Sequence, residues 1–157
     1  MKKIAIFPGS FDPITKGHES IVKRAIPLFD EIVVAIGENS EKKGFFTIEQ
    51  RLTWIEQVFK EYPTVKVRKY KGLTVEYCKD IKAKYIIRGL RKAADFEFER
   101  SIGQMNKLIY NDIETVFLLT TPKFSALNSS IVRDIIKHGG NVKQFVPDAI
   151  NIITNKQ

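Results

Sequence analysis

Short runs of apolar residues recur along the chain at the lengths expected of buried strands. They cover residues 3–7, 32–36, 65–70, 85–87 and 116–119. Helical patterns with one apolar face separate each run from the next. Alternation of this kind predicts five β–α units, which form a parallel sheet with helices on both faces. The length of 157 residues suits one domain, so we expect a single α/β domain over residues 1–157.

Local signals predict where several of the helices begin. Thr47 and Gln50 have the spacing of a capping box, and Thr74 is expected to cap the helix that follows it. The longest helical pattern covers residues 93–110 and has acidic residues near its start, where they suit the helix dipole. A short final helix is expected after residues 145–148.

The first strand is followed by a loop rich in proline and glycine. Residues 8–18 read Pro-Gly-Ser-Phe-Asp-Pro-Ile-Thr-Lys-Gly-His, and a helical pattern begins at His18. In an open α/β sheet this arrangement aims loop amides and the positive end of a helix at one point, where a phosphate is favoured. The spacing matches neither G-x-G-x-x-G nor G-x-x-x-x-G-K-[ST], which excludes the dinucleotide and P-loop fingerprints.

The formal net charge of +8 indicates an anionic partner. A nucleic-acid-binding domain would gather its basic residues on one face with aromatic residues between them. Here the lysines and arginines are spread from Lys2 to Lys156, with short runs only at 42–43 and 88–92. This distribution favours a small polyphosphate ligand held by converging loops, and we expect no nucleic-acid partner.

Several classes of protein are not expected from this sequence. No apolar run approaches the roughly 18 residues that cross a membrane, and no signal-peptide pattern follows Met1, so we expect a cytoplasmic protein with no membrane partner. The single cysteine, Cys78, cannot form an internal disulfide, which agrees with a reducing compartment. Neither C-x-x-C nor H-E-x-x-H occurs, and the two histidines are His18 and His138, so no protein cage for a metal is expected.

Two motifs resemble those of the nucleotidyltransferase superfamily. Gly-Ser-Phe-Asp-Pro at 9–13 with Thr-Lys-Gly-His at 15–18 resembles its T/H-x-G-H signature. Residues 128–133 are similar to its second signature, I-S-S-S-x-x-R, with Asn128 in place of the first serine. Over nearly its whole length the chain is most similar to the bacterial phosphopantetheine adenylyltransferase family. The resemblance implies a Rossmann-like sheet of order 3-2-1-4-5, which would bring residues 9–18 beside residues 88–91.

The resemblance also implies an activity, in which the adenylyl group of ATP is transferred to 4'-phosphopantetheine to give dephospho-coenzyme A and pyrophosphate. The acceptor phosphate is already an anionic nucleophile. Catalysis then reduces to holding two anions in line and stabilising the transition state, with no covalent intermediate. Mg²⁺ is expected to arrive with ATP, and the family implies a homo-oligomer, usually a hexamer.

Individual residues take their expected roles from the same resemblance. His18 would stabilise the charge that builds up on the α-phosphate of ATP. Ser10, which replaces the usual threonine of the family, would contact both substrates. Phosphopantetheine would be bound by Ser10, Lys42, Thr74 and Arg88. ATP would be bound by Ser10, Phe11, His18, Gly89, Leu90, Arg91, Glu99, Phe124, Ser125, Ala126, Leu127, Asn128, Ser129 and Ser130.

Structural roles remain open for several of these side chains. Lys42 also fits a solvated surface loop, Thr74 a helix cap, and Glu99 an exposed helix face. Either Asn128 or Ser129 is expected to cap the helix that follows and ends before Gly139-Gly140.

Three other functions are compatible with parts of the sequence. A hydrolase would use Ser10, Asp12 and His18 from one short loop, although the nucleophile elbow G-x-S-x-G does not occur. A related nucleotidyltransferase acting on nicotinamide mononucleotide or a choline phosphate would share the first signature, but residues 88–91 and 95–99 favour phosphopantetheine. A class I aminoacyl-tRNA synthetase would need tRNA-binding appendages for which 157 residues leave no room.

Overall fold

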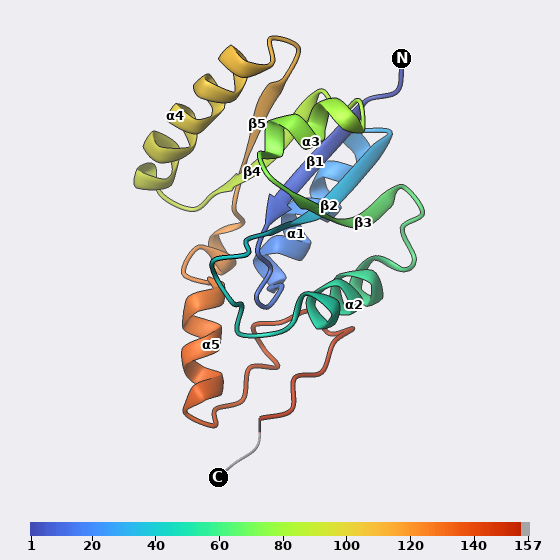
Figure 1. Ribbon diagram of the computed structural model, residues 1–157. Helices are drawn as coiled ribbons and strands as arrows, with labels where there is room; N and C mark the ends of the chain where they lie inside the picture. The colour runs from blue at the N-terminus through green and yellow to red at the C-terminus, as the bar shows by residue number, and fades with distance from the viewer. Residues whose placement is uncertain (155–157) are drawn as a thin grey trace.

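One five-stranded parallel sheet organises the protein in the computed structural model, which describes residues 1–154 (Figure 1). Its strands are β1 (Ile4–Gly9), β2 (Glu31–Glu38), β3 (Val65–Lys71), β4 (Tyr85–Leu90) and β5 (Glu114–Leu119). The order β3-β2-β1-β4-β5 confirms the predicted fold class and strand order. β1 therefore lies at the centre of the sheet, and the order of strands reverses between β1 and β4.

Helices follow each strand in the described chain. The α-helices are α1 (Lys16–Ala25), α2 (Ile48–Phe59), α3 (Thr74–Asp80), α4 (Ala93–Ile109) and α5 (Ser129–Lys137), and the 3-10 turns are η1 (Ile26–Leu28) and η2 (Pro122–Phe124). The long helix predicted over residues 93–110 is confirmed as α4. None of the helices within residues 1–154 has the length and apolar character needed to cross a bilayer.

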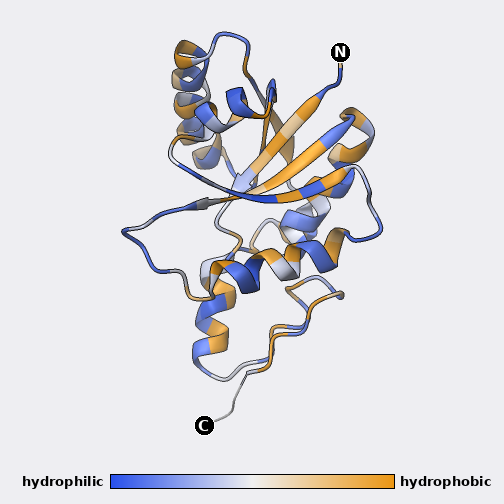
Figure 2. Ribbon diagram, turned by 45° about the vertical axis from the view of Figure 1, so that its right-hand side comes forward, coloured by the Kyte–Doolittle hydropathy of each residue, from blue (hydrophilic) through white to orange (hydrophobic). Residues whose placement is uncertain are grey.

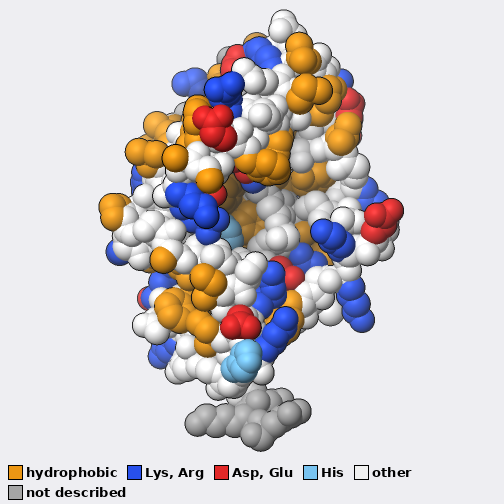
Figure 3. Space-filling view, turned by 90° about the vertical axis from the view of Figure 1, so that its left-hand side faces the viewer, with side chains coloured by type: hydrophobic (Ala, Val, Ile, Leu, Met, Phe, Trp, Pro, Cys, Tyr) orange, Lys and Arg blue, Asp and Glu red, His pale blue; other side chains and the backbone are white. Residues whose placement is uncertain are grey.

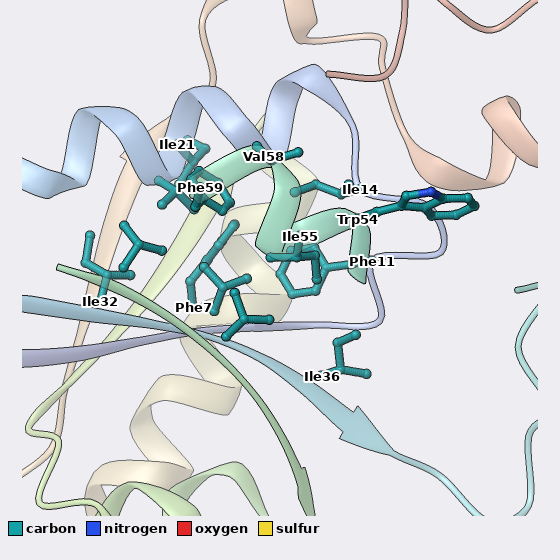
Figure 4. Close-up of a cluster of buried hydrophobic side chains, with 14 of the residues drawn as sticks. Phe7, Phe11, Ile14, Ile21, Ile32, Ile36, Trp54, Ile55, Val58 and Phe59 are labelled. Carbon is teal, nitrogen blue, oxygen red and sulfur yellow. The ribbon is translucent and has the colours of Figure 1, made fainter. Parts of the chain in front are cut away.

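The larger hydrophobic core lies between the sheet and helices α1, α2 and α5. Ala5 and Phe7 of β1 contribute to it, whereas Ile6 belongs to a smaller core on the opposite face, as the alternation of side chains along a strand requires. Figure 4 shows how side chains from β1, α1 and α2 meet in the larger core; those labelled include Phe7, Ile21, Ile55 and Phe59. This packing fixes where α1 begins, and therefore where the loop between β1 and α1 lies.

The smaller core lies beneath α3 and is completed by residues near the start of β5. Val75 and Cys78 of α3 are buried there with Ile86 of β4. Helices therefore cover both faces of the sheet, as predicted. Figure 2 shows hydrophobic residues along the central strands, while the helices alternate between hydrophobic and hydrophilic positions.

The structure confirms one predicted helix cap and corrects another. The Thr47 hydroxyl accepts a hydrogen bond from the Gln50 amide at 3.2 Å, which caps α2. Thr74 does not cap α3, because Leu73 occupies the capping position and Thr74 is the first residue of the helix. The Thr74 hydroxyl lies 2.6 Å from the hydroxyl of Tyr70, to which it is hydrogen bonded instead.

The prediction of a short final helix after residues 145–148 is wrong. Residues 138–154 form turns and irregular chain. The Ile150 amide donates to the Pro147 carbonyl at 3.1 Å, which closes a single turn that does not continue as a helix, and the Phe145 carbonyl accepts from the Lys16 amide at 2.9 Å. That bond ties the C-terminal segment to the start of α1.

Candidate active site

A cavity of about 490 Å³ opens where the strand order reverses, at the C-terminal ends of β1 and β4. Ligands bind at this position in open α/β sheets because the loops that follow neighbouring strands diverge there. The walls come from the β1–α1 loop, the first turns of α1, the end of β4, the start of α4 and residues 120–129. Figure 3 shows a hollow at the middle of this side of the molecule, with lysine and arginine side chains on both sides of it.

Two further cavities adjoin the first, and Ser10 lines all three. The second, of about 280 Å³, also shares Arg88 with the first and extends past Tyr70 and Thr74. The third, of about 560 Å³, lies beneath the β2–α2 loop and is lined by Lys42. The end of β1 is therefore a junction from which three hollows lead in different directions.

The structure brings most of the expected ATP-binding residues into the first cavity. Those that line it are Ser10, Phe11, His18, Gly89, Arg91, Glu99, Phe124, Leu127, Asn128 and Ser129. The expected residues that do not line it are Leu90, Ser125, Ala126 and Ser130.

The expected phosphopantetheine-binding residues are divided among the cavities. Arg88 lines the first and second, Thr74 the second, and Lys42 the third. His18 and Arg88 therefore share one cavity, whereas Lys42 approaches Ser10 from an adjoining one.

His18 is held at the first turn of α1 by a capping box with Thr15. The Thr15 amide donates a hydrogen bond to Nδ1 of His18 at 3.0 Å, and the His18 amide donates to the Thr15 hydroxyl at 3.4 Å. Because a backbone amide can only donate, Nδ1 must accept, and the ring proton is therefore on Nε2. Phe11 packs against the ring edge-on with the ring centroids 5.0 Å apart, which fixes the orientation of the imidazole.

The surroundings of His18 keep its ring neutral. Burial, followed by the nearby charges of Arg88 and Arg91, lowers its pKa from 6.5 to about 4. At neutral pH the side chain is therefore an uncharged imidazole whose Nε2–H can donate one hydrogen bond. Such a group can stabilise a growing negative charge without giving up or taking a proton.

Arg88 is held at the wall of the first two cavities by Glu99. Its Nε and Nη2 donate to the two carboxylate oxygens of Glu99 at 2.8 and 2.6 Å, and its Nη1 donates to the Pro8 carbonyl at 2.9 Å. Glu99 is the buried residue of α4, so this bidentate pair also fastens α4 to the site. Two of the five guanidinium N–H groups remain for a ligand.

Arg91 joins two segments that lie far apart in the sequence. Its amide donates to Asp95 at 3.0 Å, and its Nη1 donates to the Leu127 carbonyl at 3.4 Å. These bonds connect the β4–α4 loop to the segment that precedes α5. A cation is thereby placed at the rim of the first cavity.

The segment with the second signature, at the start of α5, contacts the β1–α1 loop, which carries the first. Asn128 caps α5 by accepting from the Ile131 amide at 2.9 Å, while the Ser129 hydroxyl donates to the Pro13 carbonyl at 2.8 Å. The choice left open between Asn128 and Ser129 is therefore settled in favour of Asn128 as the cap. The N-terminus of α5 contributes Asn128 and Ser129 to the wall of the first cavity.

Comparisons with known proteins agree with this geometry. A family model described as cytidylyltransferase-like matches residues 6–135. A phosphopantetheine adenylyltransferase from Flavobacterium johnsoniae is 57% identical over 148 residues, which are 94% of this chain and 97% of that protein. The enzyme of the same name from Flavobacterium psychrophilum is 53% identical over 148 residues, with the same coverage of 94% and 97%. The chain belongs to the phosphopantetheine adenylyltransferase family.

The resemblance seen in the two signatures is thus confirmed, and the protein is a nucleotidyltransferase. A putative nicotinate-nucleotide adenylyltransferase from Vibrio parahaemolyticus has a similar structure, with a TM-score of 0.65 at 18% identity. That likeness covers 95% of this chain and 96% of the other, and at this identity it supports the fold alone.

Some residues of the site carry no local signal in the sequence. Tyr70, Asn106 and Thr115 line the second cavity from three separate elements. The hydroxyl of Thr115 is buried and has no hydrogen-bond partner within the described chain. These residues come together near the end of β1 only through the arrangement of β3, α4 and β5 in the fold, which the local sequence does not indicate. Thr15, in contrast, could have been found from its capping-box spacing to His18.

Proposed function

We propose that the protein transfers the adenylyl group of ATP to the phosphate of 4'-phosphopantetheine, giving dephospho-coenzyme A and pyrophosphate. Membership of the family supports the reaction. The observation that carries it is the meeting of three cavities at Ser10, with His18, Arg88 and Arg91 around the first of them. Two phosphate-bearing molecules can approach each other there, end to end.

We place ATP in the first cavity and phosphopantetheine across the second and third. The triphosphate would lie against Arg91 and the start of α5, where helix dipole and cation both favour anions. The acceptor phosphate would lie beside Ser10, within reach of Arg88 and Lys42 from opposite sides. The second cavity, which is lined by Thr74, would take the pantetheine arm.

The reaction would then be one in-line displacement. An oxygen of the acceptor phosphate forms a bond to the α-phosphorus of ATP, and the bond from that phosphorus to the β-phosphate oxygen breaks. Pyrophosphate leaves with the electron pair, so no proton has to move in this step. His18 would donate its Nε2–H to an α-phosphate oxygen as charge builds up, a contact worth about 2 to 4 kcal/mol in the transition state.

Mg²⁺ would enter as the complex of ATP and be held chiefly by the phosphate oxygens. The carboxylates of Asp95 and Glu99 line the first cavity, but they are already bonded to the backbone amide of Arg91 and the guanidinium of Arg88. Within residues 1–154 no group of three or more His, Cys, Asp and Glu side chains is arranged to hold a metal ion.

The same geometry disfavours a hydrolase. In such an enzyme His18 would have to accept a proton from Ser10. Its Nδ1 is occupied by the Thr15 amide, and its Nε2 already carries the proton. Neither ring nitrogen is therefore available as a base, and we expect no labelling of Ser10 by a fluorophosphonate probe.

We further propose that residues 1–157 form one nucleotidyltransferase domain that assembles as a homo-oligomer, a hexamer as is usual in the family. Exposed apolar side chains on α4 support an assembly; Phe98, Met105 and Leu108 are 68%, 58% and 79% exposed. Residues 155–157 lie outside those described. We place the protein in the cytoplasm, where a free thiol such as Cys78 stays reduced.

Pyrophosphate release from ATP tests the proposed function directly. Phosphopantetheine and nicotinamide mononucleotide are supplied side by side as acceptors, at equal concentration. We expect release with phosphopantetheine to be at least about a hundredfold faster, because the second cavity suits its pantetheine arm, while the phosphate is common to both acceptors. Equal or faster release with nicotinamide mononucleotide would overturn the assignment of the acceptor.

A further inference from the structure

A buried ion pair, Asp12 with Arg51, lies between the two loops that flank the third cavity. Asp12 is 7% exposed and Arg51 is 6% exposed, and Nε of Arg51 lies 4.0 Å from Oδ1 of Asp12. Buried charges persist only where every charged atom has partners, because removing them from water is costly. The partners of this pair are therefore informative about what it does.

The side-chain hydrogen bonds of Asp12 and Arg51 all join backbone atoms of loop residues. The Phe45 and Phe46 amides donate to the two carboxylate oxygens of Asp12 at 2.7 and 2.9 Å. Nη1 of Arg51 donates to the Ser10 carbonyl at 2.8 Å. The pair therefore fastens the β1–α1 loop, which contains Ser10, to the β2–α2 loop.

The β2–α2 loop carries Lys42 just before the anchored amides. The hydrogen bonds of residues 39–42 are local ones, from the Glu41 and Lys42 amides to Asn39. At Gly44 a Cβ atom would come within 2.8 Å of Nη2 of Arg51, so the loop backbone passes directly against the guanidinium. The contacts with Asp12 and Arg51 thus set the distance of Lys42 from Ser10.

We infer that Asp12 and Arg51 are positioning residues for the acceptor phosphate, since they hold the Lys42 loop and the Ser10 backbone in one fixed arrangement. The inference rests on the proposed function, because it takes Ser10 and Lys42 as contacts of that phosphate. Both Asp12 and Arg51 line the third cavity, and neither lines the first. Loss of the Asp12 carboxylate frees the loop that carries Lys42 while Arg51 can still donate to the Ser10 carbonyl, so it should weaken binding of phosphopantetheine and leave binding of ATP nearly unchanged.

Steady-state kinetics of Asp12→Asn tests this selectivity. The amide keeps the shape of the carboxylate, but it offers one acceptor oxygen to two backbone amides and leaves Arg51 without a counter-charge. We expect the KM for phosphopantetheine to rise about tenfold and the KM for ATP to change less than about twofold. An equal rise in both KM values would overturn the inference.

Val67→Ala is the matched control for loss of stability alone. Val67 is a residue of β3 whose side chain lies in the larger core and is 8% exposed, and it lines none of the three cavities. We expect this variant to be less stable, with both KM values unchanged. Should Asp12→Asn not fold, the charge-free pair Asp12→Asn with Arg51→Met removes the buried charges together. Because Arg51→Met also releases the Ser10 carbonyl, this variant is expected to raise both KM values, that for phosphopantetheine more than that for ATP.

Hydrogen exchange in the absence of substrate tests the anchor separately from the reaction. Asp12→Asn should speed amide exchange at Phe45 or Phe46 by about tenfold or more relative to Val67→Ala, because one acceptor oxygen is left for the two amides. Unchanged exchange there would overturn the inference. A wild-type protein that releases no pyrophosphate with phosphopantetheine would instead overturn the proposed function, whatever the exchange result.

A double-mutant cycle shows whether Asp12 acts through Lys42. If it does, Lys42→Met should raise the KM for phosphopantetheine clearly less in Asp12→Asn than in the wild type. Multiplicative effects of the two substitutions would mean that Asp12 does not position Lys42, and would overturn the inference.

Discussion

His18 is the residue on which the proposed chemistry depends most. Its neutral ring carries the proton on Nε2, and the residue lines the first cavity, where the α-phosphate would lie. His18→Ala removes a contact made most strongly in the transition state, so we expect kcat to fall by a hundredfold or more. Affinity for ATP, measured by calorimetry, should change only a few-fold.

The second histidine of the chain provides a control for that experiment. His138 lies at the C-cap of α5, with 78% of its side chain exposed. His138→Ala should leave turnover unchanged. Near-normal turnover in His18→Ala would remove His18 from the mechanism.

The depressed pKa of His18 also makes a prediction about stability. Between pH 6.5 and about 4 the unfolded chain binds a proton at His18 that the native protein does not, so the stabilising contribution falls as pH is lowered through this window. At pH 4.5 about 2 kcal/mol should be lost relative to pH 7. Denaturant unfolding of the wild type and His18→Ala at both pH values isolates this contribution, since other groups cancel in the difference. An equal pH dependence in the two proteins would contradict the lowered pKa.

Among the elements, α5 shows how the second signature tolerates its departure from the family pattern. Asn128 accepts from the Ile131 amide, which a serine at the same position could also do. We expect Asn128→Ala to lower the free energy of unfolding by about 1 kcal/mol and Asn128→Ser to leave it almost unchanged. Thermal unfolding of the wild type and the two variants measures these differences. Equal stability of Asn128→Ala and Asn128→Ser would mean that Asn128 does not act as a cap.

The elements that could be predicted are those whose signals are local. Apolar runs gave all five strands to within a few residues, and the uninterrupted pattern over 93–110 gave α4. The errors came from tertiary competition for the same groups. Thr74 was expected to cap a helix, but its hydroxyl is hydrogen bonded to Tyr70, and the segment that leads into the expected final helix is tied to the start of α1 through the Phe145 carbonyl and the Lys16 amide.

The site was predictable to a similar extent. The two signatures indicated His18 and residues 128–130. Glu99, expected to contact ATP, lines the first cavity, but no local pattern showed that it also holds Arg88. Asp12 and Arg51 are 39 positions apart in the sequence, so no local pattern could show that they form one buried pair. Contacts of this kind follow from the strand order, which periodicity does not determine.

At the scale of the whole molecule, α4 presents a hydrophobic surface on the side that Figure 3 faces, where hydrophobic side chains gather around the hollow. A helix with this many exposed apolar residues is typical of a protein interface. We expect Leu108→Glu, alone or with Met105→Glu, to shift the protein toward smaller assemblies in light scattering. Arg100→Glu, a charge change at an exposed position of the same helix, is the control. An unchanged mass in the Leu108 and Met105 variants would exclude α4 from the interface.

The central claim is that the protein itself forms no bond to the adenylyl group, and only holds and stabilises two phosphate-bearing substrates while they react in line. The stereochemical course at the α-phosphorus tests it most directly. With ATP that carries one chiral sulfur substitution at the α-phosphate, a single displacement by phosphopantetheine predicts inversion of configuration in the product. Retention would require a covalent adenylyl-enzyme intermediate, and would contradict the account.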